Sequence, residues 1–198
     1  MIYDQGKAGT CTGCAMGNAI ELITSVPVPY MEILKYYADH GVSPESGFTM
    51  TDLCETMKED SLQGILVEDF TNIFHRFKKT SEEKKQMILS KVRTAVSRKR
   101  RGVLFGMIMR GTKNKMSIDQ FGVVHPKSQS ISGFHAVACV GRHLLPNGEW
   151  AFKLENSWGQ DWGQRGFFFL PEKHLFTEVK NIVLIKFKIS RRTHPDVE

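Results

Sequence analysis

Long apolar runs, metal-ligand pairs and an acidic excess are all missing from this chain of 198 residues. No apolar run approaches the ~20 residues that a membrane-spanning helix needs, so we expect no membrane segment. No second pair of cysteines or histidines has the spacing of metal ligands, so we expect neither a metal site nor a cofactor. With 41% hydrophobic and 10% aromatic residues, the chain can bury a sizeable core, which predicts a soluble globular protein.

Three residues carry a chemical pattern. Cys11 follows a loop that starts at Gln5, His135 opens the segment His-Ala-Val-Ala-Cys, and Asn156 opens Asn-Ser-Trp-Gly. A thiol attacks a carbonyl as the thiolate, which a nearby imidazole stabilises. An amide oxygen on the far ring nitrogen then fixes the tautomer of that imidazole. Together the three residues predict acyl transfer through a cysteine nucleophile.

The sequence around Cys11 favours its role as the nucleophile. Small and apolar residues recur through 11–23, which is typical of a buried helix that begins at the cysteine. The dipole and the unpaired N–H groups of a helix N-terminus stabilise a thiolate. The tetrahedral intermediate also needs hydrogen-bond donors for its oxyanion. The side chain of Gln5 and the backbone N–H of Cys11 are the candidates.

On these motifs the chain resembles the papain-like cysteine peptidases. The resemblance rests on Gln-Gly before the cysteine, Gly-Thr-Cys at the cysteine, His-Ala-Val after Phe134, and Asn-Ser-Trp-Gly followed by Trp-Gly. It covers residues 5 to about 189. The motif around the asparagine is the most specific of the four.

The resemblance implies a role for each matching residue. Cys11 is the nucleophile, His135 is the base and acid, and Asn156 orients the histidine. Gln5 is an oxyanion donor. Trp158 shields the hydrogen bond between Asn156 and His135 from water.

Cys14 is a competing nucleophile. Members of the family often carry two cysteines three residues apart, with the second one catalytic, and Cys11 and Cys14 copy that spacing. In the family pattern the glutamine lies six residues before the nucleophile, and the residue six positions after Gln5 is Cys11. This spacing favours Cys11 over Cys14. The other interpretation of Cys14 is a small buried helix residue.

Two departures from the family pattern bear on activity. Thr12 follows the nucleophile where tryptophan is usual, and Phe134 precedes the histidine where a small or polar residue is usual. Neither removes an atom that the mechanism needs. We therefore predict a cysteine-type endopeptidase. Two alternatives stay open: an impaired fold that acts as a protein-binding or regulatory module, and thiol chemistry on another acyl group, such as deubiquitination or transamidation.

The resemblance also implies an α+β fold with two subdomains and the active site in the cleft between them. We expect one domain over 1–190, with a helical part over about 11–97 and an antiparallel β-barrel-like part over about 102–189. Apolar periodicity predicts helices at 11–23, 30–40, 50–59, 69–77 and 81–96. Short apolar runs predict strands at 103–109, 121–125, 135–142, 150–155, 166–170 and 179–189. Residues 191–198 are expected to be disordered.

Substrate contacts are predicted at three residues, namely Gly47, Phe134 and Trp158. Gly47 lies roughly where the family has a glycine-rich strip that pairs with the substrate backbone, and a glycine permits that close approach. An ordinary loop glycine is the alternative. The expected partners are a peptide or protein substrate and a protein inhibitor or regulatory partner.

Charge and cysteine content bear on location and partners. Much of the formal net charge of +6 lies in the run of basic residues 98–101. This run is either a solvated linker between the two parts, or it serves as a nuclear-import signal or as a contact with nucleic acid or an acidic partner. No nucleic-acid-binding motif accompanies it, so we expect no nucleic-acid partner. Secreted members of the family usually hold several disulfides, and the lack of that framework predicts a cytoplasmic or nuclear protein. Only four residues precede Gln5, so we expect neither a signal peptide nor a propeptide.

Overall fold

The computed structural model describes residues 1–76, 79–98, 101–110, 116–126 and 129–190. The helices are α1 (Cys11–Thr24), α2 (Tyr30–Asp39), α3 (Met50–Glu59), α4 (Glu82–Val96) and α5 (Leu175–Glu178), and a 3-10 turn, η1 (Glu172–His174), precedes α5. The strands are β1 (Ile65–His75), β2 (Arg101–Arg110), β3 (Ile131–Leu144), β4 (Trp150–Glu155), β5 (Phe167–Pro171) and β6 (Val179–Ile189).

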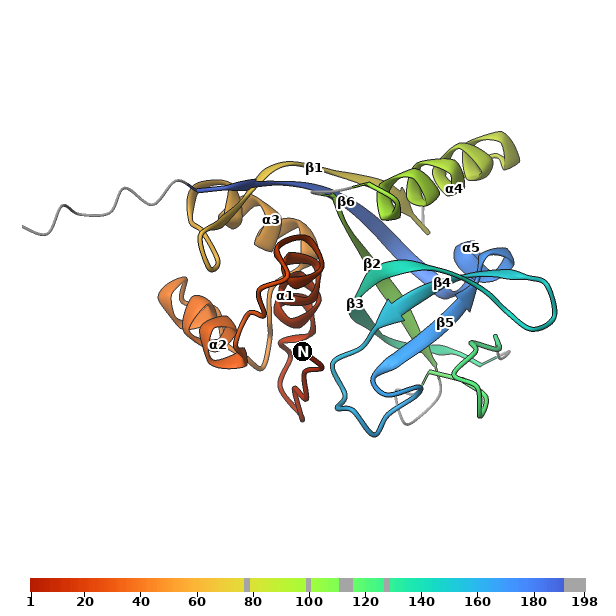
Figure 1. Cartoon of the computed structure of the whole chain (residues 1–198), viewed down its shortest axis with the longest axis horizontal. Coiled ribbons are helices and arrows are strands. Elements are labelled where there is room, and N and C mark those ends of the chain that lie inside the picture. Colours follow the sequence, from red (N-terminus) through yellow and green to blue (C-terminus); the bar gives the residue numbers. More distant parts are fainter. Residues whose placement is uncertain (77–78, 99–100, 111–115, 127–128, 191–198) are drawn as a thin grey trace, which may run out of the picture.

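The strands form one antiparallel sheet in the order β1-β6-β2-β3-β4-β5 (Figure 1). The fold is therefore α+β, as predicted. Within the described residues no pairing joins β1 to β5, so the sheet is open. The expected barrel-like closure is too strong a description of it.

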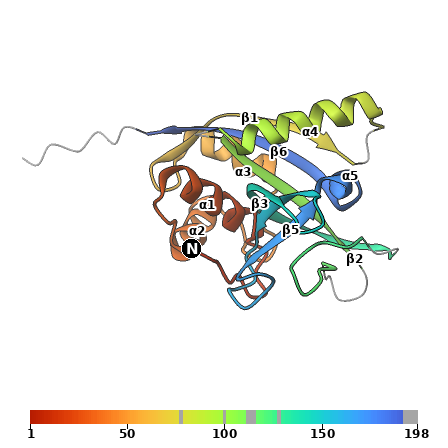
Figure 2. The ribbon, with the colours of Figure 1, turned by 45° about the vertical axis from the view of Figure 1, so that its right-hand side comes forward.

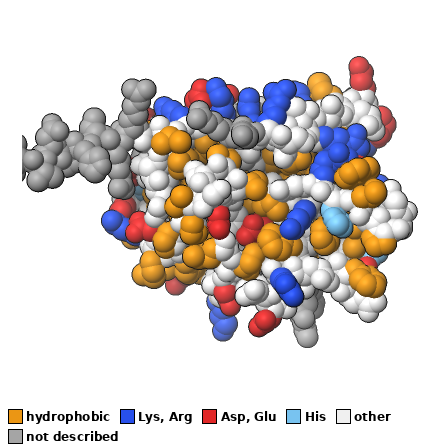
Figure 3. Space-filling view, viewed as in Figure 1, with side chains coloured by type: hydrophobic (Ala, Val, Ile, Leu, Met, Phe, Trp, Pro, Cys, Tyr) orange, Lys and Arg blue, Asp and Glu red, His pale blue; other side chains and the backbone are white. Residues whose placement is uncertain are grey.

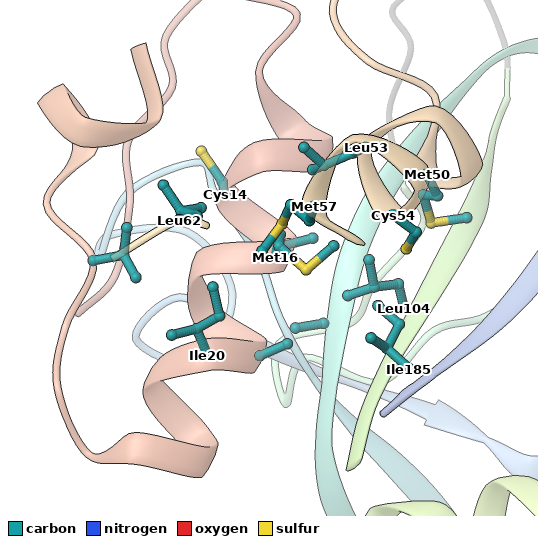
Figure 4. Close-up of a cluster of buried hydrophobic side chains, with 14 of the residues drawn as sticks. Cys14, Met16, Ile20, Met50, Leu53, Cys54, Met57, Leu62, Leu104 and Ile185 are labelled. Atoms are coloured by element: carbon teal, nitrogen blue, oxygen red, sulfur yellow. The ribbon is translucent and has the colours of Figure 1, made fainter. Parts of the chain in front are cut away.

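Helices α1, α2 and α3 gather on one side of the sheet (Figures 1 and 2). Their contact with the sheet is a cluster of buried side chains from α1, α3 and the strands (Figure 4). Met16 of α1, Leu53 of α3 and Leu104 of β2 are all at most 1% exposed. Burying a side chain of this size stabilises the fold by roughly 1.5–3 kcal/mol. The same packing sets α1 against β3, and these two elements carry Cys11 and His135.

Helix α4 packs on β2 and β3. Its buried residues Ile88 and Val92 belong to a second cluster, with Phe105 and Phe152 of the sheet. Alternate residues of β2 enter the two clusters, so α4 lies on the opposite face from α1. The predicted helical part, which ran to about residue 97, thus contains α4, although α4 packs on strands of the sheet and not with α1, α2 and α3.

The predicted helix at 69–77 is wrong, because β1 occupies 65–75 and pairs with β6. The β1–β6 register shifts between Val67 and Asp69 and again between Asn72 and Phe74. Two such irregularities interrupt the alternation of inward and outward residues that identifies a strand. The apolar residues then fall at a spacing that resembles a helix.

The predicted strand at 121–125 is also wrong. Its residues form only isolated bridges, Ile118 with Val124 and Val123 with Phe169. The Asp119 carboxylate instead accepts from the N–H groups of Phe121 and Val123, which holds the segment as a turn.

The other predicted elements are confirmed, most of them to within a few residues. The helix at 50–59 and the strands at 150–155 and 179–189 have the predicted bounds. Two helix starts are fixed by side-chain caps: Thr49 accepts from the N–H of Asp52, and Ser81 accepts from the N–H of Lys84. None of the described helices combines the length and apolar character needed to cross a bilayer.

Basic side chains gather along the upper edge of the molecule, where α4 and β1 lie (Figures 1 and 3). Arg98 and Arg101 of the predicted basic run belong to the described chain, whereas residues 99 and 100 lie outside it. The tail at 191–198, expected to be disordered, lies outside the described residues as well.

Candidate active site

Cys11 is the first residue of α1, and Thr10 occupies the N-cap position. Two tyrosines of α2 hold this first turn: the Tyr30 hydroxyl lies 2.9 Å from Thr10 Oγ1, and the Tyr37 hydroxyl accepts from the N–H of Gly13 at 3.0 Å. Cys11 is half-buried. Its thiol therefore lies where the positive end of the helix dipole favours a negative charge.

Cys14 lies one turn further along α1 and is fully buried. Burial raises the pKa of its thiol to about 12, with Cys11 adding to the rise and the Thr10 hydrogen bond opposing it. Cys54 and Cys139 are buried too, and burial raises the pKa of each thiol to about 12. All four cysteines are free thiols. A buried thiol of this kind stays protonated near neutral pH, whereas the Cys11 thiol is only half-buried. The role of Cys11 as the nucleophile stays a prediction.

His135 and Asn156 are in contact. His135 Nε2 lies 2.6 Å from Asn156 Oδ1, and both side chains are buried. The backbone N–H of Ser157 also donates to that Oδ1, at 2.9 Å. Because Oδ1 accepts both bonds, His135 Nε2 must carry a hydrogen, which leaves Nδ1 as the basic nitrogen of the neutral ring. Among the described residues, Asn156 Nδ2 has no partner.

Burial governs the charge of His135. It lowers the pKa of the imidazole to about 4, and the hydrogen bond to Asn156 opposes that shift. The ring is therefore neutral at pH 7 and can accept a proton. A protonated ring here would be stabilised by a negative partner at Nδ1.

Trp158 stacks on His135, with ring centroids 4.5 Å apart and an angle of 26° between the planes. Trp162 meets Trp158 edge-on at 5.0 Å, and Phe168 meets Trp162 edge-on at 5.4 Å. A row of aromatic rings thus runs from the histidine into the core of the sheet. It covers one face of the imidazole and limits its rotation.

The N-terminal segment is paired with the loop after β4. The N–H of Gln5 donates to the Ser157 carbonyl and the N–H of Gly159 donates to the Tyr3 carbonyl, both at 2.9 Å. Gln5 Nε2 donates to the Ala8 carbonyl, and its Oε1 accepts from the Ser157 hydroxyl. An amide nitrogen has two hydrogens, so one remains for an oxyanion. That role of Gln5 stays a prediction.

Gly47 lies against the loop that leads to Cys11. Its φ is +68°, and a Cβ at this position would lie 2.1 Å from the carbonyl oxygen of Gly9. The N–H of Gly9 donates to the Pro44 carbonyl at 2.5 Å. A larger residue does not fit at position 47. The predicted contact of Gly47 with a substrate backbone stays a prediction.

Phe134 is also a predicted substrate contact. It is 44% exposed, whereas His135, the next residue in the chain, is buried. Its ring is covered on one side by Lys180, whose Nζ lies 3.8 Å from the ring centroid. Across the part of the chain that the structure describes, no group of three His, Cys, Asp or Glu side chains is arranged to hold a metal ion.

The model of papain family cysteine proteases matches residues 3–185 of this chain. The chain belongs to the papain family. Within the family, an uncharacterized peptidase C1-like protein of Acanthamoeba polyphaga mimivirus is 34% identical over 79 residues. That match spans 38% of this chain and 24% of the viral protein, so only about a quarter of the relative is matched.

Solved papain-family proteases share the fold over 93% of this chain. Amb a 11 of ragweed pollen, in its proform, has a TM-score of 0.66 at 16% identity, and this chain covers 61% of it. Xylellain of Xylella fastidiosa has a TM-score of 0.62 at 18% identity, with 82% covered. The Carica candamarcensis protease CMS1MS2, in complex with E-64, has a TM-score of 0.62 at 13% identity, with 92% covered. At such identities the likeness shows the fold alone.

The sequence missed several residues that hold this papain-family site. Ser157 lies inside the Asn-Ser-Trp-Gly motif, yet the motif alone does not show that it ties Gln5 to the asparagine loop. Tyr30 and Tyr37 fix the first turn of α1 from another helix. Nothing local in the sequence marks them, because their contacts join residues 20 and 24 positions apart.

Proposed function

We propose that this papain-family chain is an endopeptidase that hydrolyses peptide bonds through an acyl-enzyme on Cys11. His135 serves as base and acid, Asn156 positions His135, and Gln5 with the Cys11 N–H stabilises the oxyanion. The observation that carries the proposal is the bond between His135 Nε2 and Asn156 Oδ1. It leaves Nδ1 free to take a proton from a thiol.

The chemical steps follow from these roles. His135 Nδ1 takes the thiol proton while the Cys11 sulfur bonds to the substrate carbonyl carbon, and the negative charge forms on the carbonyl oxygen. The intermediate collapses, the C–N bond breaks, and Nδ1 returns the proton to the leaving amine. Water then attacks the thioester, giving its proton to Nδ1, and the C–S bond breaks to release the acid and the thiol.

A pair of matched cysteine variants tests the nucleophile. We expect Cys11→Ala to abolish cleavage of an internally quenched peptide and to abolish covalent capture of E-64, the molecule bound in the Carica candamarcensis structure. Cys14→Ala, which changes a buried neighbour in the same helix, should keep both. The reverse pattern would assign the chemistry to Cys14. No turnover in any form would contradict the peptidase proposal.

A second candidate, a papain-like fold that binds proteins without cleaving them, is favoured by one observation. Burial of His135 disfavours the imidazolium that a resting thiolate pair requires. This candidate predicts that wild type and Cys11→Ala bind a protein partner equally well and that neither releases cleaved product. Turnover of unfolded protein that is lost only in Cys11→Ala would exclude it.

The four free thiols also support our proposal that the protein works in a reducing compartment, in the cytoplasm or nucleus. Expression with a fluorescent tag in the native host would locate it. Secretion into the medium would contradict this assignment.

A further inference from the structure

An exposed aromatic ring, at the residue that directly precedes His135, lies against an ammonium group. Phe134 keeps 44% of its surface exposed, whereas its neighbours His135 and Ala136 are both 6% exposed. The Nζ of Lys180 lies 3.8 Å from the centre of the Phe134 ring. A cation over an aromatic face is attracted by the electron density of the ring, so the two side chains form one unit.

The pair spans three neighbouring strands. Phe134 lies on β3 and pairs with Ile108 of β2, while Lys180 lies on β6, on the other side of β2 (Figure 1). The β2–β6 register shifts at this point, and Lys180 is the β6 residue left without a partner on β2. An unpaired residue at such an irregularity can point its side chain away from the regular alternation. Lys180 therefore reaches across β2 to the phenylalanine.

The pair lies on the face of the sheet that carries α1 and α3. Ala136 and Ala138 of β3 belong to the cluster that packs on α1, and Phe134 falls on the same face by alternation. On β2, a Cβ at Gly106 would lie 3.3 Å from the Met50 side chain at the start of α3. Gly106 pairs with Ala136 of β3 and with Asn181 of β6, so Phe134 and Lys180 lie close to the start of α3. In the chain, α3 begins shortly after the Gly47 loop.

The charge of Lys180 has no acidic partner in the described part of the chain. Within the described residues, no carboxylate lies within ion-pair distance of its ammonium group, whereas Lys186 of the same strand pairs with Glu68 and Arg110 of β2 pairs with Glu178. Lys180 is half-buried, which weakens solvent screening of its charge. An aromatic surface with a fixed, unpaired positive charge is complementary to a side chain that has both methylene groups and a carboxylate.

We propose that Lys180, held over Phe134, makes the protein select peptides with a glutamate at the substrate position that packs on Phe134. The methylene groups of the glutamate lie on the ring, and its carboxylate pairs with the Lys180 ammonium. This specificity rests on the proposed peptidase site, because Phe134 directly precedes His135 on β3. It is separable from cleavage, because it is a property of binding.

The test measures binding apart from turnover. Fluorescent decapeptides are made from otherwise uncharged residues, with a single Glu, Gln or Lys placed at each position in turn. Fluorescence anisotropy then gives the Kd of each peptide for the Cys11→Ala protein. At one position we expect Glu to bind about threefold to fivefold tighter than Gln, and Lys to bind weaker than Gln. The Glu/Gln ratio should fall towards one at 0.5 M NaCl, because salt screens a partly exposed pair.

Substitutions of Lys180 assign the preference. Lys180→Met should bring the Glu/Gln ratio to about one, and Lys180→Glu should make Lys the preferred residue at the same position. The matched control is Lys153→Met, because Lys153 lies over another ring, that of Phe167, with Nζ 4.0 Å from the centroid. This control should keep the wild-type ratio.

Each outcome decides one proposal. Equal Kd values for Glu and Gln at all positions, or a Glu preference that survives Lys180→Met, would overturn the role of Lys180. A Lys180-dependent Glu preference in a protein whose wild type cleaves none of the peptides would support the inference and overturn the peptidase proposal instead.

Discussion

The backbone N–H of Gln5 donates to the carbonyl of Ser157, 152 residues along the chain, at 2.9 Å. Through this bond the loop that leads to Cys11 and the loop that begins at Asn156 form one structural unit. The Ser157 hydroxyl reinforces the link by donating to Gln5 Oε1. The position of the predicted oxyanion donor is thus set by the same loop that orients His135.

Gln5→Ala should lower kcat by about 100-fold and leave KM nearly unchanged, because the oxyanion forms only during reaction. Ser157→Ala, which keeps the Gln5 side chain and removes one hydrogen bond to it, should lower kcat only severalfold. Steady-state kinetics on one quenched peptide compares the two. Equal losses would mean that Gln5 acts by holding the loop and not as a donor.

Asn156→Ala should lower kcat by about 100-fold, because the imidazole loses the acceptor that fixes its tautomer and its orientation. Since the bond to Asn156 raises the pKa of His135, its loss should also move the acid limb of the kcat/KM profile to lower pH. Asn147→Ala removes an asparagine that bonds Glu149 in an exposed turn and should leave both unchanged. A normal pH profile in Asn156→Ala would contradict a positioning role.

Gly47→Ala should destabilise the fold by about 3 kcal/mol, because it combines a positive φ with a clash against the Gly9 carbonyl. Gly64→Ala is the matched control: its φ is +73°, but a Cβ there meets nothing within 4 Å. Its cost should be about 1 kcal/mol. Urea unfolding measures both, and similar values would show that the Gly47 loop can move away from the cysteine loop.

The stability of the fold should depend on pH through two groups with opposite signs. Burial lowers the pKa of His135 to about 4, so the unfolded chain binds its proton more readily and stability rises with pH between about 4 and 6.5. Burial, with help from Glu21, raises the pKa of Glu155 to about 7, against the N-terminal amine and Lys153. The folded state then holds that proton, and stability falls as the pH rises between about 4.5 and 7.

These two effects should nearly cancel in the wild type and separate in variants. From pH 4.5 to 6.5, Glu155→Gln should gain about 2 kcal/mol in the free energy of unfolding, and His135→Gln should lose about the same amount. Urea unfolding at the two pH values tests this. Parallel changes in wild type and both variants would contradict the assigned pKa shifts.

The sequence predicted the parts of the structure that depend on local patterns. The α3 helix has a cap at Thr49 and a clear apolar face, and its predicted bounds are those observed. The strand β1 was missed because two register shifts hide its alternation, and they are visible only in its pairing with β6. The placement of α4 on the sheet likewise depends on which neighbours bury Ile88 and Val92.

In the candidate site too, local motifs predicted some features, whereas packing between distant segments determines others. Short motifs marked Cys11, His135 and Asn156, and the His135–Asn156 contact was predicted from chemistry alone. The contacts of Tyr37 with the first turn of α1, of Ser157 with Gln5 and of Lys180 with Phe134 depend on packing between distant segments. No pattern in the sequence shows those contacts.

The central claim is that Cys11 and His135 form a reactive pair, and selective alkylation tests it most directly. Limiting iodoacetamide at pH 7 is followed by mass spectrometry of the intact protein and mapping of the labelled cysteine, in wild type and His135→Ala. We expect rapid labelling of Cys11 alone in the wild type and loss of that selectivity in the variant. Labelling shared among the cysteines, at a rate that does not depend on His135, would contradict the account.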